Sequence, residues 1–133
     1  MRLYEKAQGA INNAVSKASE LGIKITVTIV DDHGTTVATR RMEGAISASP
    51  RFAHAKAYTS AVIGLPTAGM AQYSTPGKPL YGIESSLGGD LMTIAGGQPI
   101  KDGDIVIGAV GVGGSYDVTQ DDACAQAAVM AFG

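Results

Sequence analysis

Residues 23–42 read IKITVTIVDDHGTTVATRRM, and the pattern in this stretch indicates the fold class. From Ile23 to Ile29 apolar residues alternate with Lys or Thr, which predicts a strand with one buried and one polar face. The following Asp31-Asp32-His33-Gly34 supplies turn chemistry, because Gly34 can adopt a positive φ. Thr35 to Met42 is extended and begins with β-branched residues, so it is predicted to return as the second arm of a hairpin.

Helices are predicted on both sides of this hairpin. Apolar residues recur with the helical period from Leu3 to Leu21, and Gly22 stands where a left-handed C-cap is needed. After the hairpin, Ser49-Pro50 has the form of an N-cap and first helical residue, and Leu65-Pro66 ends this second helix. It carries a stripe of small residues, which we expect to pack closely against the sheet or another helix: Ala53, Ala57, Ser60 and Gly64.

The second half of the chain predicts two more helices and three more strands. A short helix is expected near residues 67–73, and a final helix opens with the capping-box variant at 119–122. Strands are expected at 90–94, 98–101 and 104–113, the last buried on both faces because its apolar residues do not alternate. The chain is therefore predicted to be a single α+β domain, residues 1–133, of order α-ββ-α-α-βββ-α, with helices flanking a five-stranded antiparallel sheet.

Composition excludes several classes of function. The 133 residues are 45% hydrophobic and 17% charged with a net charge of −2, and no Lys/Arg stripe is present, so a nucleic-acid partner is not expected. The longest apolar run, residues 105–114, is too short to span a membrane. The start of the chain does not resemble a signal peptide, and the single Cys124 agrees with a reducing compartment. We therefore expect a cytoplasmic protein.

The second predicted helix carries the most reactive side chains. His54 and Tyr58 lie one turn apart on a face distinct from the small-residue stripe. Histidine is a common ligand of haem iron and suits proton transfer near neutral pH, although a half-exposed histidine without a role is the simpler alternative. Lys56, if partly buried, could hold an anion or act as a base with a lowered pKa, or it could be an ordinary surface lysine.

Three further positions complete the set of candidates. Arg40 and Arg41 point to opposite faces of their strand, so one of them, Arg41 in our interpretation, could bind a carboxylate through its planar guanidinium. Asp31 is a candidate general base, but a turn aspartate usually caps its own backbone. Gly111 and Gly113 leave the last strand short of side chains, so a ligand or a neighbouring element must approach it closely there.

Five motifs in series give the chain a resemblance to the GlcG/HbpS-like family. They occur in the order in which that family has them: residues 27–34 with 41–45, Phe52-Ala53 with residues 56–60, residues 95–100, residues 107–112 and residues 122–125. The resemblance covers nearly the whole chain. It implies a profilin-like α+β fold, oligomers built from dimers, and haem binding or an association with corrinoid enzymes in some members.

The chain differs from the family pattern in two places. Gly113 stands where the family often has serine, and no histidine occurs between Met1 and Leu21, where haem-binding relatives have one. Iron ligation would then pass to His54, to His33 or to a tyrosine.

Two functional hypotheses follow. The first is an oligomeric accessory protein that binds haem or another tetrapyrrole, with His54 on iron, Arg41 and Lys56 on the acidic groups, and Tyr58, Gly111 and Gly113 along the ligand. The second is a cofactor-free isomerase, lyase or hydratase for a small organic acid from a catabolic pathway, with His54, Lys56 or Asp31 as catalytic residue. A scaffold without a small ligand is the third alternative.

Overall fold

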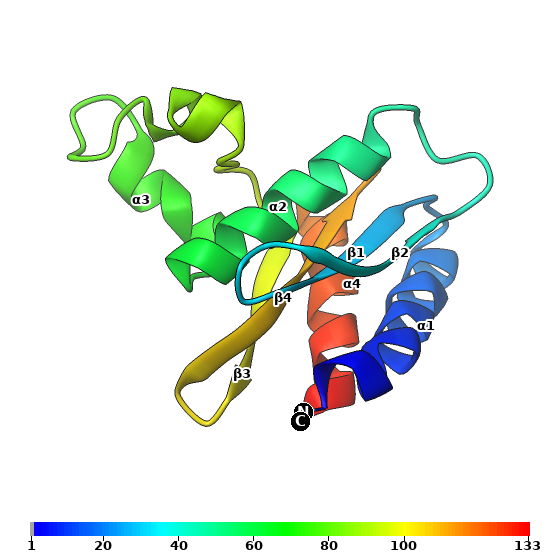
Figure 1. The fold of residues 1–133 in the computed structure, drawn as a ribbon. Coiled ribbons are helices and arrows are strands. Elements are labelled where there is room, and N and C mark those ends of the chain that lie inside the picture. Colours follow the sequence, from blue (N-terminus) through cyan, green and yellow to red (C-terminus); the bar gives the residue numbers. More distant parts are fainter. Residues whose placement is uncertain (1) are drawn as a thin grey trace.

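The computed structural model describes residues 2–133. It contains one antiparallel sheet of four strands in the order β2-β1-β4-β3, with helices on both faces (Figure 1). The helices and strands are α1 (Leu3–Leu21), β1 (Thr26–Asp31), β2 (Thr36–Arg41), α2 (Ser49–Ile63), α3 (Ala71–Ser74), β3 (Gly97–Asp102), β4 (Ile105–Gly113) and α4 (Val118–Val129). The predicted α+β class, hairpin and element order are confirmed, except for one strand.

The prediction of a fifth strand at residues 90–94 is wrong. Leu91 in this segment is buried, but the Met92 amide donates a 2.8 Å hydrogen bond to the Thr59 hydroxyl on α2. The segment therefore anchors its backbone to a helix side chain, and the sheet has four strands.

Helix ends follow local chemistry, with one further correction. Gly22 adopts φ 73° and ends α1 as predicted. At the start of α2 the N-cap is Ala48, so Ser49 and Pro50 are the first two helical residues. The Ser49 hydroxyl lies 2.8 Å from that of Thr26 on β1, so its side chain ties the helix to the sheet and does not cap it.

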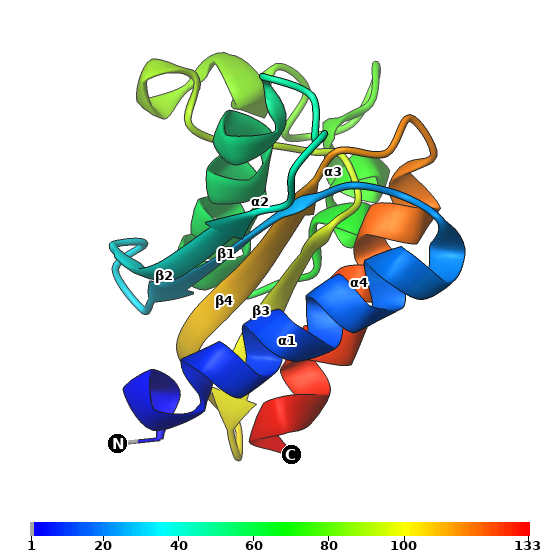
Figure 2. The same ribbon diagram turned by 90° about the vertical axis from the view of Figure 1, so that its right-hand side faces the viewer.

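The main core lies on the sheet face covered by α1 and α4, whereas α2 covers the opposite face (Figure 2). Strand residues alternate between these faces. The core face presents large apolar side chains: Val27, Ile29, Val110 and Val112. α1 and α4 cover them with closely spaced alanines and few large residues.

α2 lies unusually close to β4. A Cβ added to Gly111 would collide with the Ala53 carbonyl oxygen, and one added to Gly113 would lie 2.8 Å from the Phe52 Cβ. The predicted close approach to this glycine-rich strand is therefore confirmed, and α2 is the element that makes it. Residues 66–89 between α2 and the following segment form the short helix α3 and several 3-10 turns.

Candidate functional site

Helix α2 presents three faces, which divide its residues by role. Ala53 and Ala57 face the sheet and are fully buried. Arg51 and His54, one turn apart, face outward. Phe52 and Lys56, also one turn apart, face the loop that joins β4 to α4, where both line a hollow with Ser115 and Val118. This division follows from the helical period alone.

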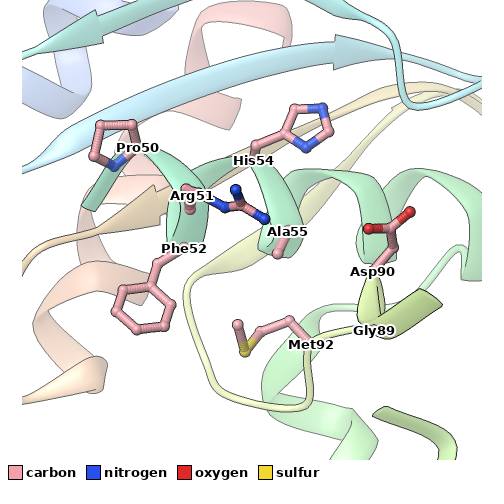
Figure 3. A pocket seen from close by; sticks show the side chains of 8 residues that line it. All are labelled: Pro50, Arg51, Phe52, His54, Ala55, Gly89, Asp90 and Met92. Atoms are coloured by element: carbon pink, nitrogen blue, oxygen red, sulfur yellow. The ribbon is translucent and has the colours of Figure 1, made fainter. Parts of the chain in front are cut away.

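The outward face borders a hollow of about 430 Å³, called here the His54 hollow. One wall comes from α2 and consists of Pro50, Arg51, Phe52, His54 and Ala55, and Gly89, Asp90 and Met92 form the other. Figure 3 shows the His54 imidazole on one side of α2 and the Phe52 and Met92 side chains on the other, with the Arg51 guanidinium between them. The hollow thus combines an imidazole, a thioether, a guanidinium and an aromatic ring.

His54 is supported by its neighbour Tyr58. The two rings are stacked, with centroids 6.4 Å apart and planes inclined by 25°. The Tyr58 ring in turn covers Gly34 of the β1–β2 turn, where an added Cβ would collide with it. The predicted shared face of His54 and Tyr58 is confirmed, but Tyr58 contacts the hairpin and does not line the His54 hollow.

The third face of α2 carries a buried ion pair. Lys56 Nζ donates to Asp121 Oδ2 at 3.1 Å and to the Val112 carbonyl oxygen at 2.9 Å. The Ser115 amide donates to the other carboxylate oxygen, Oδ1, at 3.0 Å. Both side chains are nearly inaccessible, at 3% and 1% exposure. Breaking such a pair by removing one partner leaves an unpaired buried charge, which is costly.

Burial shifts the titration of both partners. Desolvation lowers the pKa of the Lys56 amine below its ordinary 10.5, against the opposing pull of the Asp121 carboxylate. Desolvation likewise raises the pKa of Asp121 above 3.8, although Lys56 and the Ser115 amide favour the carboxylate form. Both shifts favour the uncharged form of the group concerned.

A second hollow, of about 250 Å³, opens above this pair and is called here the Lys56 hollow. Its floor includes Lys56 and Asp121. Its walls are mainly apolar and come from four segments of the chain: Ile46, Phe52, Ile94, Gly114, Ser115, Tyr116 and Val118. Phe52 lines both hollows.

The other predicted site residues lie elsewhere. Arg41 is exposed at the end of β2 and donates a 2.9 Å hydrogen bond to the Ala45 carbonyl oxygen, and it lines neither hollow. Asp31 Oδ1 accepts from the amides of His33 and Thr35 at 2.9 and 3.0 Å, so it shapes the hairpin turn. The space beside Gly111 and Gly113 is filled by α2, which corrects the expectation that these glycines line a ligand.

Sequence reasoning missed three residues of these hollows. Arg51 and Met92 were not predicted as site residues, because neither belongs to a recognised sequence motif. Asp121 was interpreted as part of a helix cap, whereas the cap is Asp117, which accepts from the Thr119 amide at 3.0 Å. One signal was present, because Asp121 shares the helix face of the buried Cys124, Ala125 and Ala128.

No helix in the described part of the chain, residues 2–133, is long and apolar enough to cross a membrane.

Known proteins show the same fold and similar sequences. The corrinoid adenosyltransferase PduO of Salmonella typhimurium is 38% identical over 119 residues, which are 90% of this chain but 35% of that protein. This chain therefore spans about a third of the length of that relative. Among solved structures, Klebsiella pneumoniae protein ORFY matches with a TM-score of 0.93 and 30% identity, over 97% of this chain and 88% of that one.

A second solved structure bears on ligands. The PduOC:heme complex matches with a TM-score of 0.91 and 35% identity, over 96% of this chain and 91% of that one. The family model described as haem degrading protein HbpS-like matches residues 4–130, which is nearly the whole chain. The chain therefore belongs to the HbpS-like family.

Proposed function

We propose that this chain binds haem or a closely related tetrapyrrole in the His54 hollow. The observation that carries the proposal is the set of side chains around that hollow. An imidazole can ligate haem iron, and the guanidinium that lies between it and the apolar Phe52 and Met92 side chains can pair with a propionate. The haem complex of a relative at 35% identity supports the same ligand class.

His54 is the residue that would hold the iron. It is exposed, its ring is stacked with that of Tyr58, and the only other histidine, His33, lies on the hairpin turn. Bound haem would supply iron for ligand binding or redox chemistry. The contribution of the chain is to bind and orient the ring.

Arg51 replaces the cations expected from the sequence. Lys56 is already paired with Asp121 and faces the other hollow, and Arg41 is bonded to its own loop. Arg51 lines the His54 hollow beside Phe52. It therefore meets the requirement for a partner of a haem propionate.

A haem titration followed by absorbance tests the proposal. We expect a Soret shift with wild-type protein and its loss in His54→Ala, whose stability without ligand should change by less than about 0.5 kcal/mol because the side chain is exposed. His33→Ala is the matched control and should keep the shift, since it removes the other histidine. A wild-type protein that produces no Soret shift excludes the proposal.

The arginine has its own test. Arg51→Met should weaken haem binding by about tenfold, equivalent to one lost charge-assisted hydrogen bond. Arg40→Met removes another exposed arginine, remote from the hollow in sequence, and should leave the affinity unchanged. Equal effects of the two variants would point to general charge attraction instead of a specific contact.

We also propose that the chain acts as a homo-oligomeric accessory protein. Large apolar or aromatic side chains are strongly exposed, among them Tyr116 at 94% and Met130 at 77%. The small-residue stripe of α2 does not support assembly, because it packs on β4 within the chain. Light scattering at micromolar concentration should give a dimer or larger closed assembly, and a uniform monomer would refute this part of the proposal.

A further inference from the structure

The Lys56 hollow is a second site whose chemistry differs from that of the His54 hollow. Its apolar walls enclose about 250 Å³, and the polar groups of its floor include one buried lysine and one buried aspartate. The hollow is therefore suited to a small molecule with one polar group and an apolar remainder.

Counting hydrogen bonds at the floor indicates which polar group fits. A lysine ammonium has three hydrogens, and those of Lys56 reach two acceptors, Asp121 Oδ2 and the Val112 carbonyl oxygen. Both carboxylate oxygens of Asp121 already accept a hydrogen bond. One hydrogen of Lys56 thus remains for a ligand, which must supply an acceptor.

Charge further restricts the ligand. Lys56 and Asp121 cancel each other, so the floor has no net charge with which to hold an anion against the cost of burying it. A neutral carbonyl oxygen accepts a hydrogen bond without bringing a charge. An aldehyde or ketone therefore fits the hollow better than the anionic ligand that was expected for Lys56 from the sequence.

We propose that the Lys56 hollow binds a small apolar aldehyde or ketone and that Lys56 forms a Schiff base with it, with Asp121 carrying the proton. Amines of buried lysines are established nucleophiles toward carbonyl carbons, provided that the amine is uncharged. The structure supplies an acceptor for the surplus proton at 3.1 Å.

The step balances within the pair and the ligand. The Lys56 ammonium gives one proton to Asp121 Oδ2, and the resulting amine adds to the carbonyl carbon, forming the C–N bond as the carbonyl oxygen takes up a proton from the nitrogen. The carbinolamine then loses its hydroxyl group as water, with the proton returned by Asp121. The products are a protonated imine on Lys56, the Asp121 carboxylate that pairs with it, and one water molecule.

Two features of the surroundings prepare Lys56 for this role. Its aliphatic stem crosses Gly96, where an added Cβ would lie 2.9 Å from both Cδ and Nζ, so the absence of a side chain there lets the amine reach the floor. Burial also lowers the pKa of Lys56, even though Asp121 and Asp122 of α4 oppose the shift. Asp117 acts on Asp121 and favours its protonated form.

Reductive trapping on the full-length, haem-free protein tests this proposal. Protein is treated with butanal and sodium cyanoborohydride at pH 6, and butylation of each lysine is followed by peptide mass spectrometry. Lys56 should be labelled about tenfold faster than the other lysines, because a lowered pKa leaves more neutral amine at this pH. The five comparison sites are Lys6, Lys17, Lys24, Lys78 and Lys101.

The opposite result is equally informative. A closed structural ion pair would make Lys56 the slowest of the six lysines to react, and that outcome overturns the proposal using wild-type protein alone. The experiment contains no haem and does not involve His54, so its failure is independent of the proposal for the His54 hollow.

Two variants identify the hollow as the route to Lys56. Ile94→Trp places a bulky ring in a wall without touching the pair and should slow labelling of Lys56 by about tenfold or more. Ile105→Trp, at a position 70% exposed outside the hollow, is the matched control and should leave the rate unchanged. Equal labelling of Lys56 in both variants would contradict entry through the Lys56 hollow.

Discussion

The two faces of the sheet use the same strands for different purposes. Toward α1 and α4, β1 and β4 present large apolar side chains that are fully buried. Toward α2, the same strands present mostly small or polar residues beside the larger Val30: Thr26, Thr28, Ala109, Gly111 and Gly113. On the α1/α4 face, much apolar surface is buried. On the α2 face, the helix backbone lies close to the sheet, and the buried polar groups are hydrogen-bonded.

Charge separates the faces further. The α1/α4 face contains one titratable side chain in its core cluster, Cys124, and burial together with the Asp121 carboxylate raises the pKa of its thiol to about 11. It therefore stays uncharged at neutral pH. On the α2 side, Lys56 is buried and pairs with Asp121, which reaches it from α4. A buried, perturbed amine is a candidate functional group, so we infer that the α2 side carries the function.

The strongest test of this contrast is Lys56→Met. It leaves the Asp121 carboxylate buried without its partner and should lower the free energy of unfolding by about 3–5 kcal/mol in urea denaturation. The double variant Lys56→Met/Asp121→Leu removes both charges and should recover most of that loss. If the double variant is as unstable as the single one, the cost lies in packing, and the contrast between the faces weakens.

A second test uses the close approach of α2 to β4. Gly111→Ala adds a methyl group that meets the Ala53 carbonyl oxygen and should destabilise the fold by about 1–3 kcal/mol. Gly9→Ala in α1 is the control, because nothing lies within 4 Å of the added Cβ, and it should stabilise the fold by about 0.5–1 kcal/mol. Thermal unfolding of both variants would show whether the two changes differ in sign.

The smallest of the three effects is a pH dependence, because the attraction between the partners offsets part of each desolvation. The raised pKa of Asp121 means that the native state binds more protons than the unfolded state just above pH 3.8, so stability falls as pH rises through that window. The lowered pKa of Lys56 means that the unfolded state binds more protons just below pH 10.5, so stability rises again toward that pH.

The double variant supplies the reference for this measurement. Subtracting its urea-unfolding free energies from those of wild type across the pH range should leave a curve that is lowest between the two folded-state pKa values. A difference that does not change with pH would show that the pair has ordinary pKa values.

Local patterns in the sequence predicted most of the fold. The hairpin and α1 follow from alternation, turn chemistry and Gly22, all of which act between near neighbours. The strand expected at residues 90–94 failed because its backbone partner is Thr59, a side chain distant in sequence. Strand propensity is judged from the residues of the segment alone and does not include the distant residue to which its backbone is hydrogen-bonded.

The sites were harder to predict for the same reason. Lys56 was identified as a reactive lysine, but its partner Asp121 is 65 residues away and could be found only as an acid on an apolar helix face. Arg51 joins the His54 hollow because Gly89, Asp90 and Met92 fold back over α2. No spacing of residues in the sequence predicts that this segment folds back onto α2.

The contact of Tyr58 with Gly34 links the hairpin turn to the His54 hollow. One tyrosine ring is stacked on His54 and also presses on the backbone of the turn. Movement of the His54 imidazole would shift the Tyr58 ring. The ring-current contribution of Tyr58 to the chemical shift of Gly34 would then change. The Gly34 amide resonance should therefore act as a built-in spectroscopic reporter of events at His54, read without a label at either residue.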